Sequence, residues 1–480
     1  MSRPTVAQAA AWRVADLRLA ADRWEADARA VHARAEAARS VPIAAWTGQA
    51  ADAARRRMDA LRGNADDIAT ALVLAAAAAR DAADQLGAAQ DGVTALVETA
   101  RSEGYSVDDG GGVHSAAPPT ELLTLLAGGD PDVARDLQRA RAAELTRQLA
   151  AALERLGVAD ADAARDVDEA FAAGLPATAP APTSPAAAAA PTGEDWDVRV
   201  AENRLRVARE VLDVAAGTPR ADLYRALLAE IDDPSGSGAR IDRQILDFDP
   251  ARNVLVELNG DLRRADHVAV LVPGMNTTLD GSAATTGTAR SFVTASGGDV
   301  AAITYLGGPF PQSDVLPLAV LEASDPRYAL AMAPRLAAFS HDLDRVVDGT
   351  GRPVDVTYIG HSYGGAILGT AEVVGLTADR TLYVAAAGAG VGVDEPSDWH
   401  NGNPSVSRYS LTAPGDPIAL VQQLAVHGVD PDEMPGVQRL EAGRYDDGRP
   451  VEGLAAHSDV LAVPTSDAWR TVLAVISGAR

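Results

Sequence analysis

Residues 354–368 read VDVTYIGHSYGGAIL, and this stretch decides the fold of the C-terminal half of the chain. Its first six residues form a mostly apolar run, typical of a strand buried on both faces. The run leads into Gly360-His-Ser-Tyr-Gly364, a Gly-x-Ser-x-Gly pattern, and then into a helical pattern. A sharp strand-to-helix turn strains the backbone and leaves no room for neighbouring side chains, which explains the glycines. The stretch predicts that the hydroxyl of Ser362 stands clear of a sheet edge. The alternative is a glycine-rich turn with an incidental serine.

Strand-like and helix-like segments alternate around this stretch, after two helical segments at 196–214 and 219–232. Such alternation predicts an α/β fold, in which a mostly parallel sheet is covered by helices. The strand candidates are 245–248, 254–258, 267–272, 300–305, 354–359, 382–386, 406–411 and 437–440.

A serine at its ordinary pKa is a poor nucleophile, so it needs a base and a group that orients the base. With this type of turn the chain order is Ser, then Asp or Glu, then His. We assign the base to His457, which follows the last strand candidate. His427 precedes that strand and is expected to shape its loop, and His400 is expected at the surface.

The best-placed acid is Asp416, in a Pro-Gly-Asp-Pro turn just past the strand candidate at 406–411. Sites in open α/β sheets form at the carboxyl ends of the strands. The alternative is that Asp416 only caps a helix that begins near Pro417. Asp394 and Asp398, past the preceding strand, are the other candidates for the acid.

An acyl-transfer site also needs donors for an oxyanion. The N–H after the nucleophile, of Tyr363, is the usual first donor, and the second comes from the loop after an earlier strand. Here that loop contains Gly274, and we assign the second donor to the N–H of Met275. Met275 as a plain core side chain is compatible with this backbone role. We expect Gly274, Asn276 and His361 to border the substrate, and the chemistry needs no metal and no organic cofactor.

The N-terminal region carries two heptad patterns, at 8–39 and 54–96, on either side of a break at Val41-Pro42. Two long amphipathic helices with a short connection are expected to pack antiparallel. The connection contains Trp46-Thr-Gly48, and Tyr105-Ser-Val-Asp-Asp109 follows the second helix.

A Trp-x-Gly turn between two such helices, followed by Tyr-x-x-x-Asp, resembles the WXG-type proteins exported by type VII secretion. The resemblance implies a partner hairpin, the type VII machinery and a secreted or cell-envelope location, or a cytoplasmic one if the signal is not used. Alternatively, Trp46 plugs one end of a hairpin and Tyr105 is a loop aromatic.

The predicted domains are a WXG-like helical hairpin over 1–104, a helical segment with an Ala/Pro-rich linker over 105–194, and an α/β-hydrolase domain over 195–480. We expect further helices at 119–172 and an extended linker at 174–192. Residues 105–194 contain no catalytic constellation.

Composition excludes several classes of function. The 480 residues carry a net charge of −25, which disfavours nucleic acid and anionic lipid as partners. There is no cysteine, so disulfides, thiolate nucleophiles, iron–sulfur clusters and cysteine-ligated zinc are excluded. The most apolar run, 68–79, is too short to span a bilayer, and the N-terminus lacks the pattern of a signal peptide.

Residues 240–465 resemble the actinobacterial α/β-hydrolase family catalogued as domain of unknown function 1023. The chain departs from that pattern at Tyr305, where a tryptophan is expected, and at Asn276, where glycine is usual. The matching stretches are 266–278, 360–364, 415–418, 427–431 and 457–459.

The resemblance implies an α/β-hydrolase fold and hydrolase chemistry but names no substrate. We therefore predict a serine hydrolase of the esterase or lipase type, acting on a small-molecule or lipid ester. The alternative is a type VII-secreted effector or interaction protein that uses the fold as a toxin or as a non-catalytic scaffold.

Overall fold

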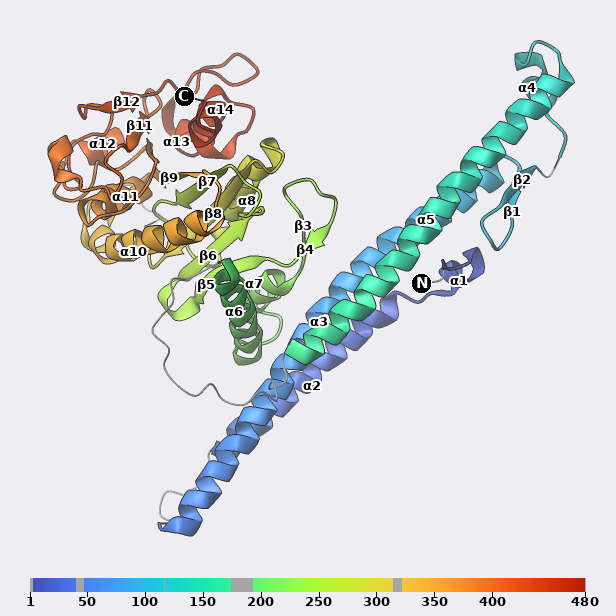
Figure 1. Cartoon of the computed structure of the whole chain (residues 1–480), viewed down its shortest axis with the longest axis horizontal. Coiled ribbons are helices and arrows are strands. Elements are labelled where there is room, and N and C mark those ends of the chain that lie inside the picture. The colour runs from blue at the N-terminus through green and yellow to red at the C-terminus, as the bar shows by residue number, and fades with distance from the viewer. Residues whose placement is uncertain (1–2, 40–46, 116, 174–192, 314–321, 480) are drawn as a thin grey trace. The chain divides into compact units, whose positions relative to one another are not determined.

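The computed structural model describes residues 3–39, 47–115, 117–173, 193–313 and 322–479 (Figure 1). The chain divides into two compact units, Met1–Ala181 with Ala208–Ala229, and Pro182–Val207 with Glu230–Arg480. The limits of these units differ from those of the predicted domains, whose boundaries at residues 104 and 194 stay a prediction.

The first unit is helical, with one small β-hairpin (Figure 1). Helix α6 (Gly193–Asp213) crosses the boundary, and its residues 208–213 belong here. The other elements are α1 (Val6–Ala11), α2 (Ala15–Arg39), α3 (Gln49–Ser102), β1 (Tyr105–Val107), β2 (Val113–Ser115), α4 (Glu121–Leu126), α5 (Pro131–Ala173) and α7 (Pro219–Leu228).

Helices α2 and α3 pack antiparallel, as the heptads predicted. Arg18 pairs with Asp84 near the start of α2, whereas Glu36 pairs with Arg62 near its end. The single helix expected over 8–39 is, however, interrupted between Ala11 and Ala15. Gln90 of α3 compensates for the break, because its Nε2 donates to the carbonyl oxygens of Ala9 and Trp12 at 2.7 and 3.0 Å.

A third long helix, α5, packs along α3. A helix in this region was predicted, but its packing against α3 was not. Leucines at helical spacing on α5 are buried against apolar residues of α3 such as Val93 and Val97, so the two seams form one core. The buried leucines of α5 are Leu145, Leu149, Leu153 and Leu156.

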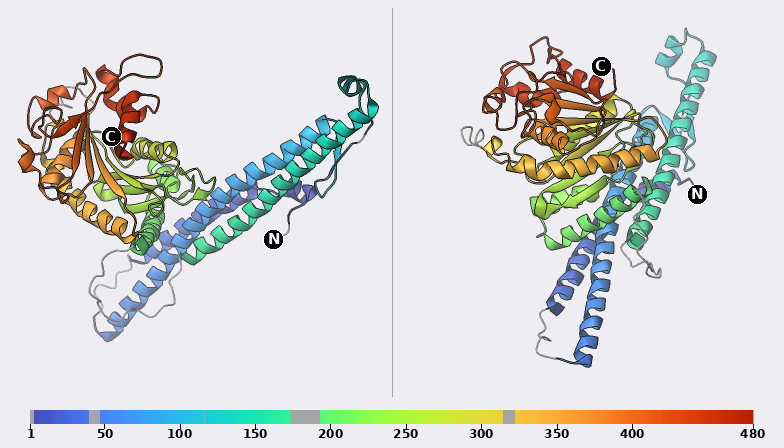
Figure 2. Two further views of the ribbon diagram at one scale, coloured as in Figure 1. Left: turned by 45° about the horizontal axis from the view of Figure 1, so that its top comes forward. Right: turned by 60° about the vertical axis from the view of Figure 1, so that its left-hand side comes forward.

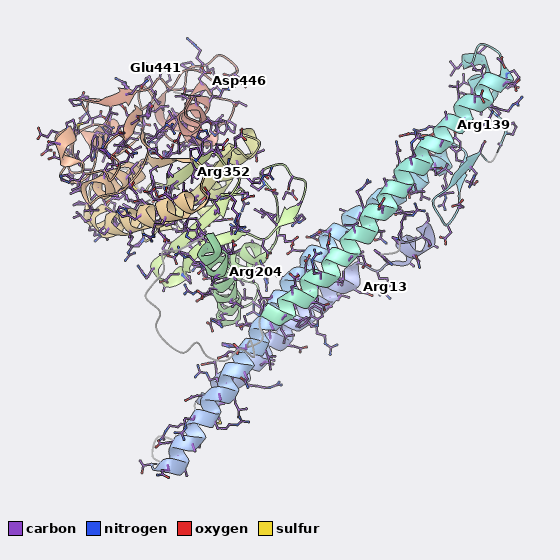
Figure 3. All side chains as sticks on the ribbon, in the orientation of Figure 1. Arg13, Arg139, Arg204, Arg352, Glu441 and Asp446 are labelled. Atoms are coloured by element: carbon purple, nitrogen blue, oxygen red, sulfur yellow. The ribbon has the colours of Figure 1, made fainter. Side chains whose placement is uncertain are left out.

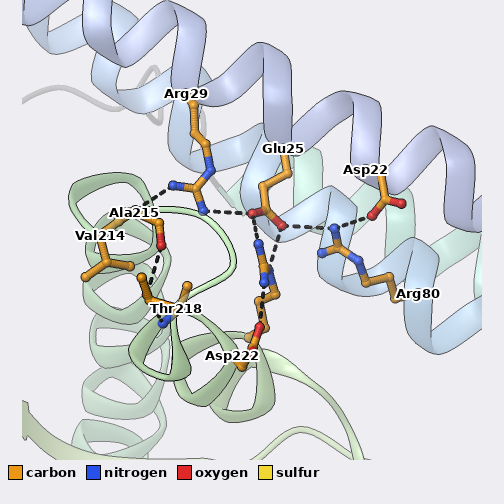
Figure 4. A network of polar contacts seen from close by, with 10 residues as sticks. Asp22, Glu25, Arg29, Arg80, Val214, Ala215, Thr218 and Asp222 are labelled. Carbon is orange, nitrogen blue, oxygen red and sulfur yellow. Dashed lines mark hydrogen bonds and ion pairs between the residues drawn. The ribbon is translucent and has the colours of Figure 1, made fainter.

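A carboxylate is buried in this unit among three arginines (Figure 4). Glu25 is 4% exposed. It accepts from Arg29 at 2.9 Å and Arg225 at 2.6 Å, and it lies 2.9 Å from Arg80. Burial by itself would raise the pKa of Glu25, but the bonds from Arg225 and Arg29 and the charge of Arg80 outweigh it and lower the pKa to about 2. Arg29 also donates to the carbonyl oxygen of Val214, so the cluster ties the α6–α7 turn to α2 and α3.

The second unit is built on an eight-stranded sheet with the order β12-β11-β10-β9-β7-β8-β6-β5. Strand β6 alone runs opposite to the other seven strands of this sheet, so the predicted mostly parallel α/β fold is confirmed. Each strand candidate corresponds to a strand: β5 (Gln244–Asp249), β6 (Val254–Asn259), β7 (His267–Val272), β8 (Val300–Gly307), β9 (Asp355–His361), β10 (Arg380–Val384), β11 (Ser407–Leu411) and β12 (Val437–Arg439).

The helix expected over 219–232 is shorter than predicted. It ends at Leu228, and Ile231–Asp232 forms β3, which pairs with β4 (Arg240–Ile241). Asp233 precedes Pro234, and a residue before proline disfavours the helical conformation.

Helices cover both faces of the sheet (Figure 2). One face packs against α8, α13 and α14, where Phe292 stacks on Trp469 with ring centroids 5.1 Å apart. Helices α10 and α11 pack against the other face. The remaining elements are η1 (Pro250–Arg252), α8 (Ser282–Ala295), α10 (Arg327–Gly349), α11 (Tyr363–Val373), η2 (Pro396–Asp398), α12 (Ala419–Gln422), α13 (Gly453–Ala462) and α14 (Asp467–Ile476).

Charged side chains project from the surfaces of both units (Figure 3). Many form ion pairs in the second unit, such as Arg263 with Asp197 and Arg352 with Asp266. Exposed pairs of this kind contribute about 0–1 kcal/mol each, so the apolar core rather than the surface holds this unit together. No helix in the described ranges is long and apolar enough to cross a bilayer.

Candidate active site

The strand-to-helix turn forms as the sequence predicts. Ser362 lies between β9 and α11 with φ 54° and ψ −120°, a strained conformation for a residue with a side chain. Its N–H donates to Val384 O at 3.0 Å, and its carbonyl accepts from Ala387 N at 2.9 Å. The glycines are required, because a Cβ on Gly364 would lie 2.1 Å from the carbonyl oxygen of Val272.

Three side chains predicted to form a triad meet at this turn. Ser362 Oγ lies 3.0 Å from His457 Nε2, and His457 Nδ1 lies 2.9 and 3.1 Å from the two carboxylate oxygens of Asp416. They come from the β9–α11 turn, from α13 and from the loop between β11 and α12. A carboxylate only accepts, so Nδ1 carries its hydrogen towards Asp416 and Nε2 is left to accept from the serine hydroxyl.

The alternative interpretation of Asp416, a helix cap, is not confirmed, because the N-cap of α12 is Ile418 and no side chain caps this helix. Asp416 is 4% exposed, and its Oδ1 accepts from the N–H of Ile418 at 2.8 Å. This bond holds the turn that precedes α12, while the same carboxylate contacts the ring of His457.

The other candidates for acid and base lie elsewhere. Asp398 accepts from the N–H groups of Asp394 and Glu395 at 2.8 and 2.9 Å, which lowers the pKa of Asp398 and caps η2. His400 Nδ1 contacts the carbonyl oxygen of Val373 at 3.1 Å. His427 is buried and donates from Nε2 to Ala323 O at 2.7 Å, and burial lowers the pKa of its ring.

The loop after β7 passes close to the serine. A Cβ on Gly274 would lie 2.6 Å from Ser362 Cβ and 3.1 Å from its Oγ, so only glycine fits. The structure gives the N–H groups of Met275 and Tyr363 no protein acceptor among the described residues. Met275 follows Gly274, which lies against the serine, and Tyr363 follows the serine itself. Oxyanion donors are needed at such positions beside the nucleophile.

Asn276 shows why its departure from glycine is tolerated. Its φ is 63°, in the left-handed region that asparagine accepts more readily than most residues. Its side chain accepts from Ser313 N at 2.8 Å and donates to Ser313 O at 3.0 Å. Asn276 borders the cavity, but these two bonds commit its amide to holding the loop after β8.

A cavity of about 620 Å³ opens onto Ser362 and His457, within the range of sites for small ligands. Gly274, Asn276 and His361, which are predicted to border the substrate, are among the residues that line it. Its walls are mainly apolar: Leu271, Pro273, Met275, Ile418, Val421, Leu454 and Leu461.

The sequence analysis missed the wall that α13 contributes. Leu454, Ser458 and Leu461 line the cavity beside His457. Ser458 directly follows His457, whereas Leu454 and Leu461 lie three and four residues from it, on the same face of the helix. That spacing could have identified them once residues 453–462 were recognised as helical. Among the described residues, no group of three or more potential ligand side chains is arranged to hold a metal ion.

Comparison with known families agrees with this architecture. Residues 249–426 match the model of an alpha/beta hydrolase family. The match includes Ser362 and Asp416 and ends before His457. The C-terminal unit has the α/β-hydrolase fold, with a mostly parallel eight-stranded sheet between helices. No curated protein matches the chain.

Three similar solved structures are hydrolases by their titles. A dienelactone hydrolase-like promiscuous phosphotriesterase from metagenomic libraries is 16% identical, with a TM-score of 0.28, covering 49% of this chain and 97% of its own. Carboxyl esterase 2 of the mycorrhizal fungus Tuber melanosporum is 14% identical, with a TM-score of 0.27, and the match covers 51% of this chain and 88% of that one. A hyperthermophilic esterase of the archaeon Pyrobaculum calidifontis is 12% identical, with a TM-score of 0.24, and the match covers 58% of this chain and 96% of that one. Similarity at this level says nothing about the reaction of this chain.

Proposed function

We propose that the protein is a serine hydrolase that cleaves carboxylic esters. One observation carries this proposal: Ser362 Oγ, His457 and Asp416 form an unbroken line of contacts at 3.0 and 2.9 Å beside an open cavity. A hydroxyl, an imidazole and a carboxylate in that order are the parts that acyl transfer requires.

The reaction follows from the geometry. Ser362 Oγ attacks the ester carbonyl carbon while His457 Nε2 takes the hydroxyl proton, and Asp416 stabilises the resulting imidazolium. The negative charge on the former carbonyl oxygen is met by the N–H groups of Met275 and Tyr363. The intermediate collapses, the alcohol leaves with the proton from Nε2, and Ser362 keeps the acyl group. Water then repeats the sequence, which releases the acid and restores the serine.

The cavity walls support an ester with an apolar part, from a small molecule or a lipid. Leu271, Ile418, Val421 and Leu454 border the site, and burial of apolar surface favours binding by about 25 cal/mol per Å². The proposed steps use no metal or organic cofactor.

Labelling with a fluorophosphonate probe tests the nucleophile and separates an enzyme from a non-catalytic scaffold. We expect one phosphonyl group per chain, on the peptide that contains Ser362. Ser362→Ala should remove the label, whereas Ser458→Ala, which changes another serine of the same cavity, should keep it. A wild-type chain that takes no label would leave the scaffold alternative as the better one.

We also propose that the N-terminal helices are an export module of the WXG type, with a partner hairpin and the type VII machinery as its partners. The protein would then be secreted or held in the cell envelope, and cytoplasmic where the signal is not used. The antiparallel packing of α2 and α3 supports this, as does Gly48, which precedes α3 with φ 103°. Trp46 lies outside the described residues. Membership of the C-terminal unit in domain of unknown function 1023 is proposed on the motifs given above.

The position of Tyr105 shapes the export test. Its side chain is buried in β1, and its hydroxyl donates to Gln138 O at 3.3 Å. The second signal residue, Asp109, accepts from the N–H of Ala7 at 2.7 Å. Tyr105→Ala would therefore disturb packing as well as the signal.

Tyr105→Phe keeps the ring and serves as the matched variant. In a host with a type VII system, we expect Tyr105→Ala to remain in the cytosol, while Tyr105→Phe reports how much the hydroxyl contributes. Equal amounts of wild type and Tyr105→Ala in the culture filtrate would contradict the export proposal.

A further inference from the structure

His361 makes a contact that substrate binding does not explain. It ends β9 and directly precedes Ser362. Its Nε2 lies 2.7 Å from the carbonyl oxygen of His457, and the two imidazole rings are 5.1 Å apart between centroids. A carbonyl oxygen only accepts, so His361 is the donor. Two consecutive residues thus contact His457: Ser362 contacts the ring of His457, and His361 contacts its backbone carbonyl.

The helix that carries His457 needs directional ties. Helix α13 faces the core through Ala456, Val460 and Leu461, and apolar contacts alone are non-directional. At its start, the N–H of Gly453 donates to Pro414 O at 2.8 Å, which ties α13 to the loop that bears Asp416. The bond from His361 ties the middle of α13 to the turn that bears the nucleophile.

The His361 end of this tie is firmly held. Strand β9 lies between β7 and β10, with His361 opposite Val384 in the register of the parallel pair. The next residue, Ser362, is bonded through its N–H to Val384 O at 3.0 Å. The tie therefore runs from the centre of the sheet to the backbone of the proposed base.

We propose that His361 is a positioning residue that fixes the backbone of His457, so that its ring meets Ser362 and Asp416 together. The inference rests on the proposed esterase function. Burial, together with the positive charge that His457 can carry, lowers the pKa of His361 to about 4. At neutral pH His361 is therefore an uncharged donor, and it does not oppose the positive charge that His457 gains during the reaction.

Two neutral amide variants test the tie. The amide nitrogen of glutamine can take the place of imidazole Nε2, whereas asparagine is one methylene too short to reach His457 O. A small misplacement of a reacting group costs up to about 10²-fold in rate, so we expect His361→Asn to lose about that much in kcat. KM should stay unchanged, and His361→Gln should keep most of the activity.

If His361 instead contacted the substrate, the substitutions would change KM rather than kcat alone. In that case KM rises in both variants and Gln does not rescue. Equal loss of kcat in the two variants, or none in His361→Asn, would also overturn the positioning role. Tyr445→Phe is the matched control, because it removes another bond to α13, from the Tyr445 hydroxyl to Asp459 at 2.6 Å, away from the nucleophile. Its kcat should remain that of the wild type.

A readout independent of turnover completes the test. The Nδ1 proton between His457 and Asp416 should give a downfield proton NMR signal in the wild type and in His361→Gln. In His361→Asn the signal should broaden or disappear, and an unchanged signal would contradict the tie. If the wild type hydrolysed no ester, the esterase proposal would fail, while this NMR comparison would still test the positioning role of His361.

Discussion

Two buried carboxylates, one in each unit, are held by different kinds of partner. Glu25 of the helical unit lies among Arg29, Arg80 and Arg225 (Figure 4). Asp416 of the hydrolase unit contacts the ring of His457. Arginine stays protonated at every pH at which a protein folds, whereas histidine changes its charge near neutrality.

The difference separates a structural site from a chemical one. The interactions of Glu25 have the same strength before and after any reaction, so they can only stabilise the fold. The interaction of Asp416 strengthens when His457 takes a proton, so it lowers the energy of a charged state that exists only during turnover. Neutralising Glu25 should therefore cost stability, and neutralising Asp416 should cost rate.

The largest effect is expected at the nucleophile. Ser362→Ala removes one oxygen and should reduce ester hydrolysis on the order of a millionfold, the loss seen for a triad serine. The melting temperature should hardly change, because no buried partner besides His457 loses a bond. Hydrolysis of a chromogenic ester and a thermal melt measure the two quantities. Residual activity above a tenth of the wild type would place the nucleophile elsewhere.

The next largest effect concerns the acid. Asp416→Asn keeps the shape and an oxygen that can accept from the N–H of Ile418, but it can favour the wrong tautomer of His457. In a serine protease triad the same change of aspartate to asparagine costs roughly 10⁴-fold in kcat. Turnover should collapse with little change in melting temperature. If Asp416 were only a helix cap, stability would fall by about 1 kcal/mol and activity would survive.

Glu25 gives the opposite pattern. Its pKa is lowered from 4.5 to about 2, so the stabilisation is complete above pH 4.5 and is lost as the pH falls towards 2. That shift corresponds to about 3 kcal/mol. Hydrogen exchange of the α2 and α3 peptides, corrected for the intrinsic effect of pH, should show this loss in the wild type.

Glu25→Gln is the comparison variant for that series. It should exchange faster at neutral pH and show a flatter pH dependence, because the group that titrates is gone. Ester turnover at neutral pH should match the wild type. A pH dependence equal to that of the wild type would show that other carboxylates destabilise the unit in acid.

Local sequence patterns predicted most of the hydrolase fold and its candidate site. Several of the strands are mostly apolar segments, such as β7 and β8, and the turn at Ser362 consists of consecutive residues, so both can be identified within a short stretch of sequence. The chain order of nucleophile, acid and base then pointed to Asp416 and His457. The predicted nucleophile, oxyanion donors and substrate residues line one cavity, because the loops at the carboxyl ends of parallel strands share one edge of the sheet.

Contacts between distant residues were beyond such patterns. Glu25 and Arg225 are 200 residues apart, and nothing near either residue indicates the other. The leucines of α5 predicted a helix but not that its partner would be α3. His361 was expected to touch substrate, because its bond to the backbone of His457 depends on where α13 lies, which the sequence does not reveal.

The smallest effect is expected at Asp398, and it sharpens the assignment of Asp416. Asp398 Oδ2 accepts from the N–H groups of Asp394 and Glu395, and neither Asp398 nor Asp394 contacts His457. Asp398→Asn keeps an oxygen acceptor but loses its charge, so the melting temperature should fall only slightly. Turnover should fall less than about tenfold, which corresponds to less than about 1.4 kcal/mol in the barrier.

Asp394→Asn is the control, because its backbone N–H, rather than its carboxylate, makes the bond to Asp398. Turnover and melting temperature should both change less still in this variant. Turnover and melting temperature of the two variants, measured beside Asp416→Asn, distinguish a cap from an orienting acid. Loss of activity in either Asp394→Asn or Asp398→Asn, with a melting temperature like that of the wild type, would mean that the acid has been assigned to the wrong loop.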